Sequence, residues 1–125
     1  MRILMDTNAL MMPVECDVRV FDELDRLFSN PELLVPRAVL AELDDLSGSH
    51  GTEAVAASVG RDLADRCRPI DHEQSEADDA CVELASENAC EFVCTNDRPL
   101  RDRLLDIEMP VVGMRGANTL AVTEP

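Results

Sequence analysis

The amino-acid sequence predicts an α/β protein, a three-layer α/β/α sandwich around a central, mainly parallel sheet. Short apolar segments of strand length alternate along the chain with longer segments whose apolar residues recur at helical spacing. Pro, Gly and Asn mark most of the boundaries between them. Parallel strands need crossover connections, and these are right-handed. The intervening helices are therefore expected on both faces of the sheet.

Each predicted element rests on an apolar pattern and on residues that start or stop it. In chain order we expect strand 2–5, helix 17–28, strand 33–35, helix 36–48, helix 52–66, strand 69–71, a helix from 75, strand 91–95, helix 98–106 and strand 111–114. Apolar residues on one face indicate helix 17–28, and Asn30-Pro31 ends it. Pro36 suits the first turn of the next helix. After a flexible loop, Thr52 with Glu53 opens an alanine-rich helix.

The second half of the chain repeats this alternation. Ser75 is the expected N-cap of a helix, with Asp78 three residues later in the capping position. A short apolar strand precedes Thr95, a helix follows Asp97, and residues 111–114 form the last predicted strand. Neither an internal repeat nor a low-complexity linker interrupts the pattern. We therefore expect residues 1–125 to form a single domain.

The charge of the chain is unusual. Twenty-six acids face eleven arginines, without a single lysine, and the net charge is −15. Such a charge argues against a nucleic-acid partner, because phosphate binding draws on basic patches. Arginine in place of lysine with a dispersed acidic surface resembles the proteins of halophilic archaea. In molar salt the Debye length is roughly 3 Å, so the repulsion would be screened.

Other composition features exclude several classes of protein. Apolar stretches are too short to span a membrane, and Asp6 and Asn8 break the N-terminal one, so a signal peptide is not expected. We expect a soluble cytoplasmic protein without a membrane partner. The five cysteines form no CxxC pair, which favours buried reduced thiols over a zinc site.

Two predicted strand ends close on matching polar clusters. Asp6-Thr7-Asn8 follows the first strand, and Thr95-Asn96-Asp97 follows Phe92-Val93-Cys94. In an open α/β sheet, ligands bind in the crevice beyond the carboxyl ends of the strands. The two aspartates are therefore expected in one cleft, where they would suit a divalent cation.

Two predicted helices carry further acids. Glu42 follows the second strand, and Asp78-Asp79 lies in the first turn of its helix. Each has a simpler interpretation: the helix dipole favours a first-turn aspartate, and Glu42 could belong to an exposed acidic face. The order strand–Asp, helix–Glu, helix–Asp, strand–Asp favours one shared site.

This order of motifs resembles the PIN-domain family of small α/β nucleases, over residues 2 to about 115. It is most similar to the compact archaeal Fcf1-like and VapC-like members. The resemblance implies a PIN-like fold and Mg²⁺ or Mn²⁺ as cofactor. It also implies four catalytic and metal-binding acids: Asp6, Glu42, Asp79 and Asp97. The aliphatic pattern after the doubled aspartate favours Asp79 as the inward ligand and Asp78 as the cap.

The residues around these acids are expected to support them. The supporting hydrogen-bonding set comprises Thr7, Asn8, Asp78, Thr95 and Asn96. For Asn8 and Thr95, turn chemistry at a strand end is an equal alternative. Arg98 is a candidate phosphate contact. Arg101 and Arg103 are assigned to the helix surface. Four clustered carboxylates would repel one another without metal, which would raise the pKa of some of them.

The expected function is divalent-metal-dependent hydrolysis of phosphodiester bonds in single-stranded or structured RNA, in rRNA processing or as a toxin. The alternative is a non-catalytic PIN-fold scaffold that binds RNA or a partner protein in ribosome assembly. Phosphatases and receiver domains that share the first strand end depend on a lysine, and a P-loop is absent. The expected partners are RNA, a second copy in a homodimer, and an antitoxin or a ribosome-assembly protein.

Overall fold

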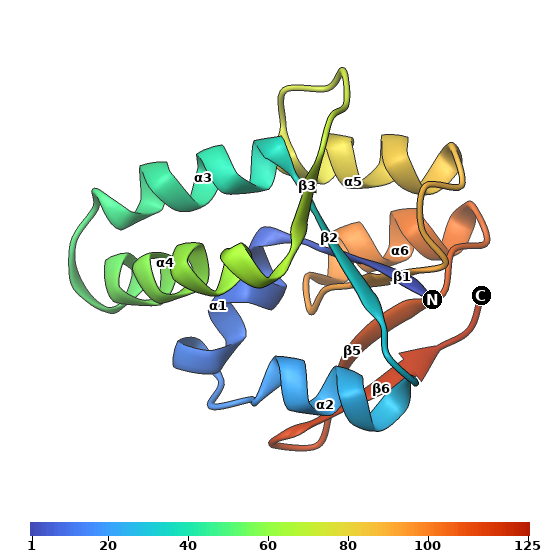
Figure 1. Ribbon diagram of the computed structural model, residues 1–125, viewed down its shortest axis with the longest axis horizontal. Helices are drawn as coiled ribbons and strands as arrows, with labels where there is room; N and C mark the ends of the chain where they lie inside the picture. The colour runs from blue at the N-terminus through green and yellow to red at the C-terminus, as the bar shows by residue number, and fades with distance from the viewer.

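A six-stranded sheet runs through the protein in the strand order β3-β2-β1-β4-β5-β6 (Figure 1). The computed structural model describes all 125 residues. The strands are β1 (Arg2–Met5), β2 (Glu32–Pro36), β3 (Arg68–Ile70), β4 (Phe92–Cys94), β5 (Val111–Arg115) and β6 (Thr119–Thr123). The helices are α1 (Thr7–Glu15), α2 (Val20–Leu27), α3 (Arg37–Ser47), α4 (Gly51–Leu63), α5 (Ala77–Ser86) and α6 (Arg98–Asp106), with a short 3-10 turn η1 (Ala64–Arg66). All neighbouring strands are parallel except β5 and β6, so the predicted mainly parallel α/β fold is confirmed.

Some elements differ from the sequence prediction. The structure adds α1 and the antiparallel strand β6, so β5 is not the last strand. Helix α2 is shorter than the predicted 17–28, and Asp17 has a φ of 54°, which is incompatible with a right-handed helix. The predicted N-cap Ser75 is wrong, because α5 begins at Ala77 with Glu76 at the N-cap position and no side-chain cap bond.

Strand register brings the two polar clusters together. Leu4 of β1 lies opposite Leu34 of β2 on one side and Val93 of β4 on the other. Met5 and Cys94 are therefore level at the ends of β1 and β4, and the Asp6 amide donates to the Cys94 carbonyl at 3.3 Å. The carboxyl ends of these strands meet at one edge of the sheet, which we call the carboxyl edge.

The core explains how the helices are held on the sheet. A cluster of 31 buried residues is built from Leu, Val, Ala, Ile, Met and Cys. Gly60 of α4 lies so close to α1 that an added Cβ would stand 2.7 Å from the Leu10 carbonyl oxygen. All cysteines are free thiols, and burial raises the pKa of Cys67 and of Cys90 to about 12. None of the helices is both long and apolar enough to cross a membrane.

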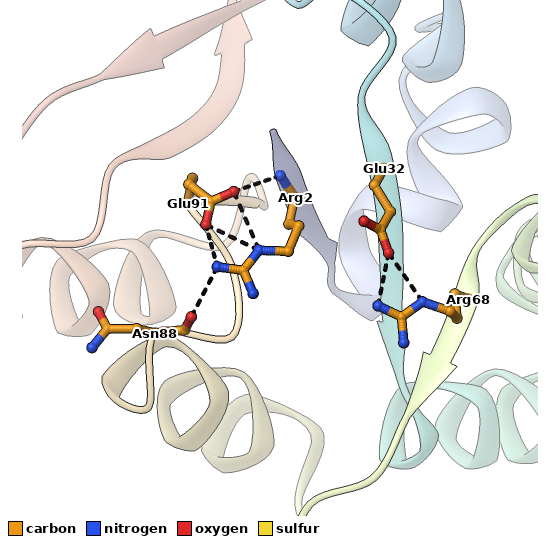
Figure 2. Close-up of polar contacts among 5 residues, drawn as sticks. All are labelled: Arg2, Glu32, Arg68, Asn88 and Glu91. Carbon is orange, nitrogen blue, oxygen red and sulfur yellow. Dashed lines mark hydrogen bonds and ion pairs between the residues drawn. The ribbon is translucent and has the colours of Figure 1, made fainter.

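The opposite edge of the sheet, the amino edge, carries paired charges (Figure 2). The Arg2 guanidinium donates to Glu91, with Nε 3.1 Å from Oε2, and also to the Asn88 carbonyl. On the neighbouring strands, Arg68 Nη2 donates to Glu32 Oε1 at 2.7 Å. Each acid shown at this edge therefore has its own arginine.

Candidate active site

Asp6 and Asp97 each end a strand and begin a helix. Asp6 Oδ1 accepts from the Ala9 amide at 2.7 Å and caps α1. Asp97 Oδ1 accepts from the Leu100 amide at 2.9 Å and caps α6. Asp is among the preferred N-cap residues because its carboxylate satisfies a free amide of the first helical turn. One oxygen of each carboxylate is thereby fixed by its own helix.

Hydrogen bonds join the two polar clusters across the carboxyl edge. Asn8 Oδ1 accepts from the Asn96 amide at 2.9 Å, and Thr95 Oγ1 accepts from the Asp97 amide at 3.0 Å. Asn96 Oδ1 in turn accepts from the Met114 amide of β5 at 3.3 Å. Asn8 and Thr95 thus fix the backbone on either side of Asn96, next to Asp97.

Gly113 is a supporting residue that sequence reasoning missed. A Cβ at this position of β5 would stand 2.9 Å from the Thr95 carbonyl oxygen. A side chain there would push the end of β4 away from β5. The signal in the sequence was a glycine inside the segment predicted as strand 111–114, which indicates close approach of another backbone.

The acids meet in an open cavity at the carboxyl edge, with a volume of about 240 Å³. It is lined by Asp6, Thr7, Asn8, Met11, Glu15, Glu42, Leu46, Glu53, Asp78 and Asp97. The lining contains six carboxylates and not one basic side chain. Glu42 arrives from α3 and Asp78 from α5, so elements far apart in sequence contribute to one cavity.

Asp79 does not line this cavity, contrary to the choice made from the sequence. Its Oδ1 accepts from Arg103 Nη2 at 2.9 Å, and both residues line a separate depression between α5 and α6. Successive helical residues point about 100° apart. With α5 beginning at Ala77, Asp78 is the member of the pair directed to the cavity, and it does not serve as the N-cap.

Asp6 is the most buried of these acids, with 3% of its surface exposed. Burial raises its pKa from 3.8 to about 7, although hydrogen bonds from Thr95 and from the Ala9 amide oppose this rise. The negative charges of Asp78 and Asp97 raise the Asp6 pKa further. The pKa of Asp78 is also raised, by burial first and then by Asp97 and Glu42. Mutual repulsion among the gathered acids is therefore part of the site.

The chemistry of the lining fits a hard divalent cation. Carboxylate oxygens are the ligands that Mg²⁺ and Mn²⁺ prefer, and neither imidazole nor thiolate lines the cavity. Thr7, 8% exposed, adds a hydroxyl whose oxygen has no hydrogen-bond partner. No three acidic, His or Cys side chains stand close enough in this structure to hold an ion as they are. Binding would require the carboxylates to converge.

Comparison with known proteins identifies the family of this chain. Residues 3–117 match the family model described as a PIN like domain. The chain belongs to the PIN-like domain family. This PIN-like domain is 26% identical over 118 residues to Ribonuclease VapC4 of Methanocaldococcus jannaschii, covering 91% of this chain and 90% of that protein. It is also 26% identical over 117 residues to the rRNA-processing protein FCF1 of Saccharomyces cerevisiae. That alignment covers 92% of this chain and only 60% of the yeast protein.

Solved structures of low sequence identity share the fold of this PIN-like domain. The PIN domain endonuclease Utp24 superposes with a TM-score of 0.80 at 23% identity, covering 99% of this chain and 92% of that chain. A VapBC2 structure from Rickettsia felis, bound to a DNA fragment from its promoter, gives a TM-score of 0.67 at 15% identity. The superposition covers 92% of this chain and 100% of that chain. These likenesses establish the architecture around the cavity.

Two acids of the cavity were not among the sequence-predicted site residues of this PIN-like domain. Glu15 lies at the end of α1 and Glu53 in the first turn of α4, and both line the cavity. Because α1 was not predicted, nothing in the sequence placed Glu15 near the other acids. Arg98, the candidate phosphate contact, is exposed at the start of α6 and lies outside the lining.

Proposed function

We propose that this PIN-like domain is a divalent-metal-dependent endoribonuclease of the cytoplasm. The observation that carries the proposal is the cavity at the carboxyl edge, which Asp6, Glu42, Asp78 and Asp97 line together without a basic residue. Leaving carboxylates uncompensated raises the free energy of the folded protein unless a cation binds there. A cation held by these acids would in turn attract a phosphodiester to an otherwise anionic surface.

Each acid has a distinct part in this proposal. Asp6, Glu42, Asp78 and Asp97 would hold Mg²⁺ or Mn²⁺, which when bound supplies the Lewis acidity that phosphodiester hydrolysis requires. Asp6 must lose its proton to serve as a ligand, and with a pKa of about 7 it does so near neutral pH. Thr95 and Asn8 keep the Asp97 backbone in place through their bonds to the Asp97 and Asn96 amides.

The substrate and partners follow from the relatives. One relative is a ribonuclease and another an rRNA-processing protein, so we propose RNA as the substrate of this chain. A toxin paired with an antitoxin and a factor of ribosome assembly are the two roles that these relatives suggest. In high salt, screening would allow RNA to approach a protein with a net charge of −15. Arg98, exposed beside Asp97, would then contact a flanking phosphate.

A second candidate function is a non-catalytic scaffold that binds RNA or a partner protein in ribosome assembly. It is favoured by one observation: no three of the acids are already close enough to hold an ion. In that case the cavity would bind neither Mn²⁺ nor Mg²⁺ tightly. Metal binding therefore separates the two candidates.

The neighbouring aspartates of α5 provide a matched test. We expect Asp78→Asn and Asp6→Asn to lower the rate of Mn²⁺-dependent cleavage of a labelled RNA by about 100-fold or more, because each removes a cavity carboxylate. Asp79→Asn, which removes a charge outside the cavity and keeps an oxygen that can accept from Arg103, should stay within about threefold of wild type. Purifying all variants in parallel, with EDTA controls, excludes a contaminating nuclease. Equal activity in the three variants would contradict the assignment.

A further inference from the structure

Helix α3, which carries Glu42, begins without a cap of its own. The residue at its N-cap position is Pro36, whose side chain offers no hydrogen-bond acceptor. The amides of the first helical turn need acceptors from outside the helix. One of them, the Ala38 amide, donates to His72 Nε2 at 3.0 Å. A histidine from another segment thus replaces the missing cap.

This bond can form only while the imidazole is neutral. Because Nε2 accepts, the ring is neutral and its proton lies on Nδ1. Nδ1 is buried and has no hydrogen-bond partner. A protonated imidazole would carry N–H groups at both positions, so it could not accept from Ala38. It would also place a positive charge at the positive end of the helix dipole.

The segment that contains His72 is fastened to both α3 and α5. We call residues 71–74 the strap; in Figure 1 it belongs to the connection between β3 and α5, beside the start of α3. On the α5 side, Glu83 accepts from the Glu73 amide at 2.9 Å and from the Gln74 amide at 2.8 Å. On the α3 side, Arg37 pairs with Asp71 in addition to the His72 bond.

The strap therefore links the two helices that supply the outer acids of the cavity. Glu42 lies four residues, about one turn, after Ala38 on α3. Asp78 lies in the first turn of α5, which the strap leads into. Both acids line the same cavity, from different helices. A change in the contact between the strap and α3 would alter how these two carboxylates face each other.

We propose that His72 is a positioning residue, which in its neutral form holds α3 against the strap and so sets the separation of Glu42 and Asp78 for cation binding. This inference rests on the proposed function and adds a control of metal affinity by a residue that does not touch the metal. The charged residues next to this contact are Arg37, which precedes Ala38 and pairs with Asp71, and Glu83, which accepts from the Glu73 amide.

The test compares His72→Gln with His72→Phe. A glutamine oxygen can accept from the Ala38 amide at every pH, whereas phenylalanine fills the space without an acceptor. We expect the Mn²⁺ dissociation constant of His72→Gln at pH 8 to stay within about threefold of wild type, and that of His72→Phe to rise about tenfold, as for other residues that orient metal ligands. Titration calorimetry on the full chain gives these constants.

The pH dependence separates positioning from simple packing. Between pH 8 and pH 5.5, wild-type affinity should fall about tenfold more than that of His72→Gln. Protonation of Asp6 is common to both proteins and cancels in their ratio. This comparison uses only wild type and His72→Gln, so it can be made even if His72→Phe fails to fold. A constant ratio of the wild-type and His72→Gln affinities at all pH values would overturn the role of His72.

An exchange measurement distinguishes failure of this inference from failure of the proposed function. Hydrogen exchange of the Ala38 amide should be slow in wild type at pH 8 and in His72→Gln at both pH values, after correction for intrinsic rates. It should be fast in wild type at pH 5.5. Absence of Mn²⁺ binding by wild type at every pH would overturn the proposed function, and the positioning role with it. Unchanged Ala38 protection with normal Mn²⁺ binding would overturn the positioning role alone.

Discussion

The two edges of the sheet treat the same kind of side chain in opposite ways. At the amino edge, Glu91 meets Arg2 and Glu32 meets Arg68 (Figure 2). At the carboxyl edge, six carboxylates line one cavity that has no basic residue in its wall. The chain contains eleven arginines, and none of them lines this cavity.

The pKa values show the physical consequence of this difference. Hydrogen bonds from Arg2 lower the pKa of Glu91, so its ionised form favours the folded state. Burial, with Asp78 and Asp97 nearby, raises the pKa of Asp6 to about 7, so its ionised form opposes folding. Charge pairing at one edge adds to stability, whereas burial of the Asp6 carboxylate among other acids at the other edge costs stability. Strongly perturbed groups in a cleft are typical of functional sites, which supports the proposed function of the carboxyl edge.

The largest expected effect on stability is a gain from Asp6→Asn. A carboxyl whose pKa rises from 3.8 to about 7 on folding opposes folding increasingly above pH 3.8, by up to about 4 kcal/mol above pH 7. Asparagine keeps an oxygen for the Ala9 amide. Urea unfolding in EDTA should show Asp6→Asn to be more stable than wild type at pH 8 and equally stable near pH 3. A loss of stability at pH 8 would show that the Asp6 carboxylate is structural.

A divalent cation should reverse this penalty in wild type. At a Mn²⁺ concentration of 100 times the dissociation constant, the free energy of unfolding should rise by about 2.7 kcal/mol, because the ion binds only the folded state. Asp6→Asn should gain much less, since it lacks one ligand. Thermal or urea unfolding with and without Mn²⁺ measures both gains. Equal stabilisation of the two proteins would place the cation elsewhere.

Most of the architecture can be predicted from the sequence, because the strands and most helices carry their own period and boundary residues. Helix 98–106 is found at Arg98–Asp106, where Asp97 caps it and a proline lies at its start. Helix α1 is harder to see: it contains Pro13, and Leu10, Met11 and Met12 are all buried, so no polar face shows its period. The available signal was the capping aspartate before it.

The strand β6 and the inward aspartate show two further limits. Gly116, with a φ of 73°, lies in the turn between β5 and β6. The polar and small residues beside it do not reveal that the segment after the turn pairs with β5. The choice between Asp78 and Asp79 depends on the rotation of α5 against the sheet. A shift of one residue turns a helix by about 100°, and only tertiary packing fixes that rotation.

At the amino edge, Glu91→Gln should lower stability modestly. The lowered pKa of Glu91 means that its contribution is present above its unfolded pKa of 4.5 and is lost as the pH falls below that value. Because the pair is partly exposed, we expect a loss of about 1 kcal/mol at pH 7 and none near pH 3. The same urea experiment at both pH values measures it. A gain in stability of Glu91→Gln at pH 7 would show that Glu91, like Asp6, opposes folding, and the two edges of the sheet would no longer differ.

The smallest expected effect is that of the Arg68–Glu32 pair. The side chains of Arg68 and Glu32 are 62% and 50% exposed, so solvent screens their attraction. A double-mutant cycle with Arg68→Ala and Glu32→Ala should give a coupling energy of about 0.5 kcal/mol or less. In 1 M salt, where the Debye length is roughly 3 Å, this coupling should fall toward zero. Glu32 also lies opposite Arg2 in the β1–β2 register, so a coupling above about 1 kcal/mol that survives salt would show that the amino edge acts as one charge network.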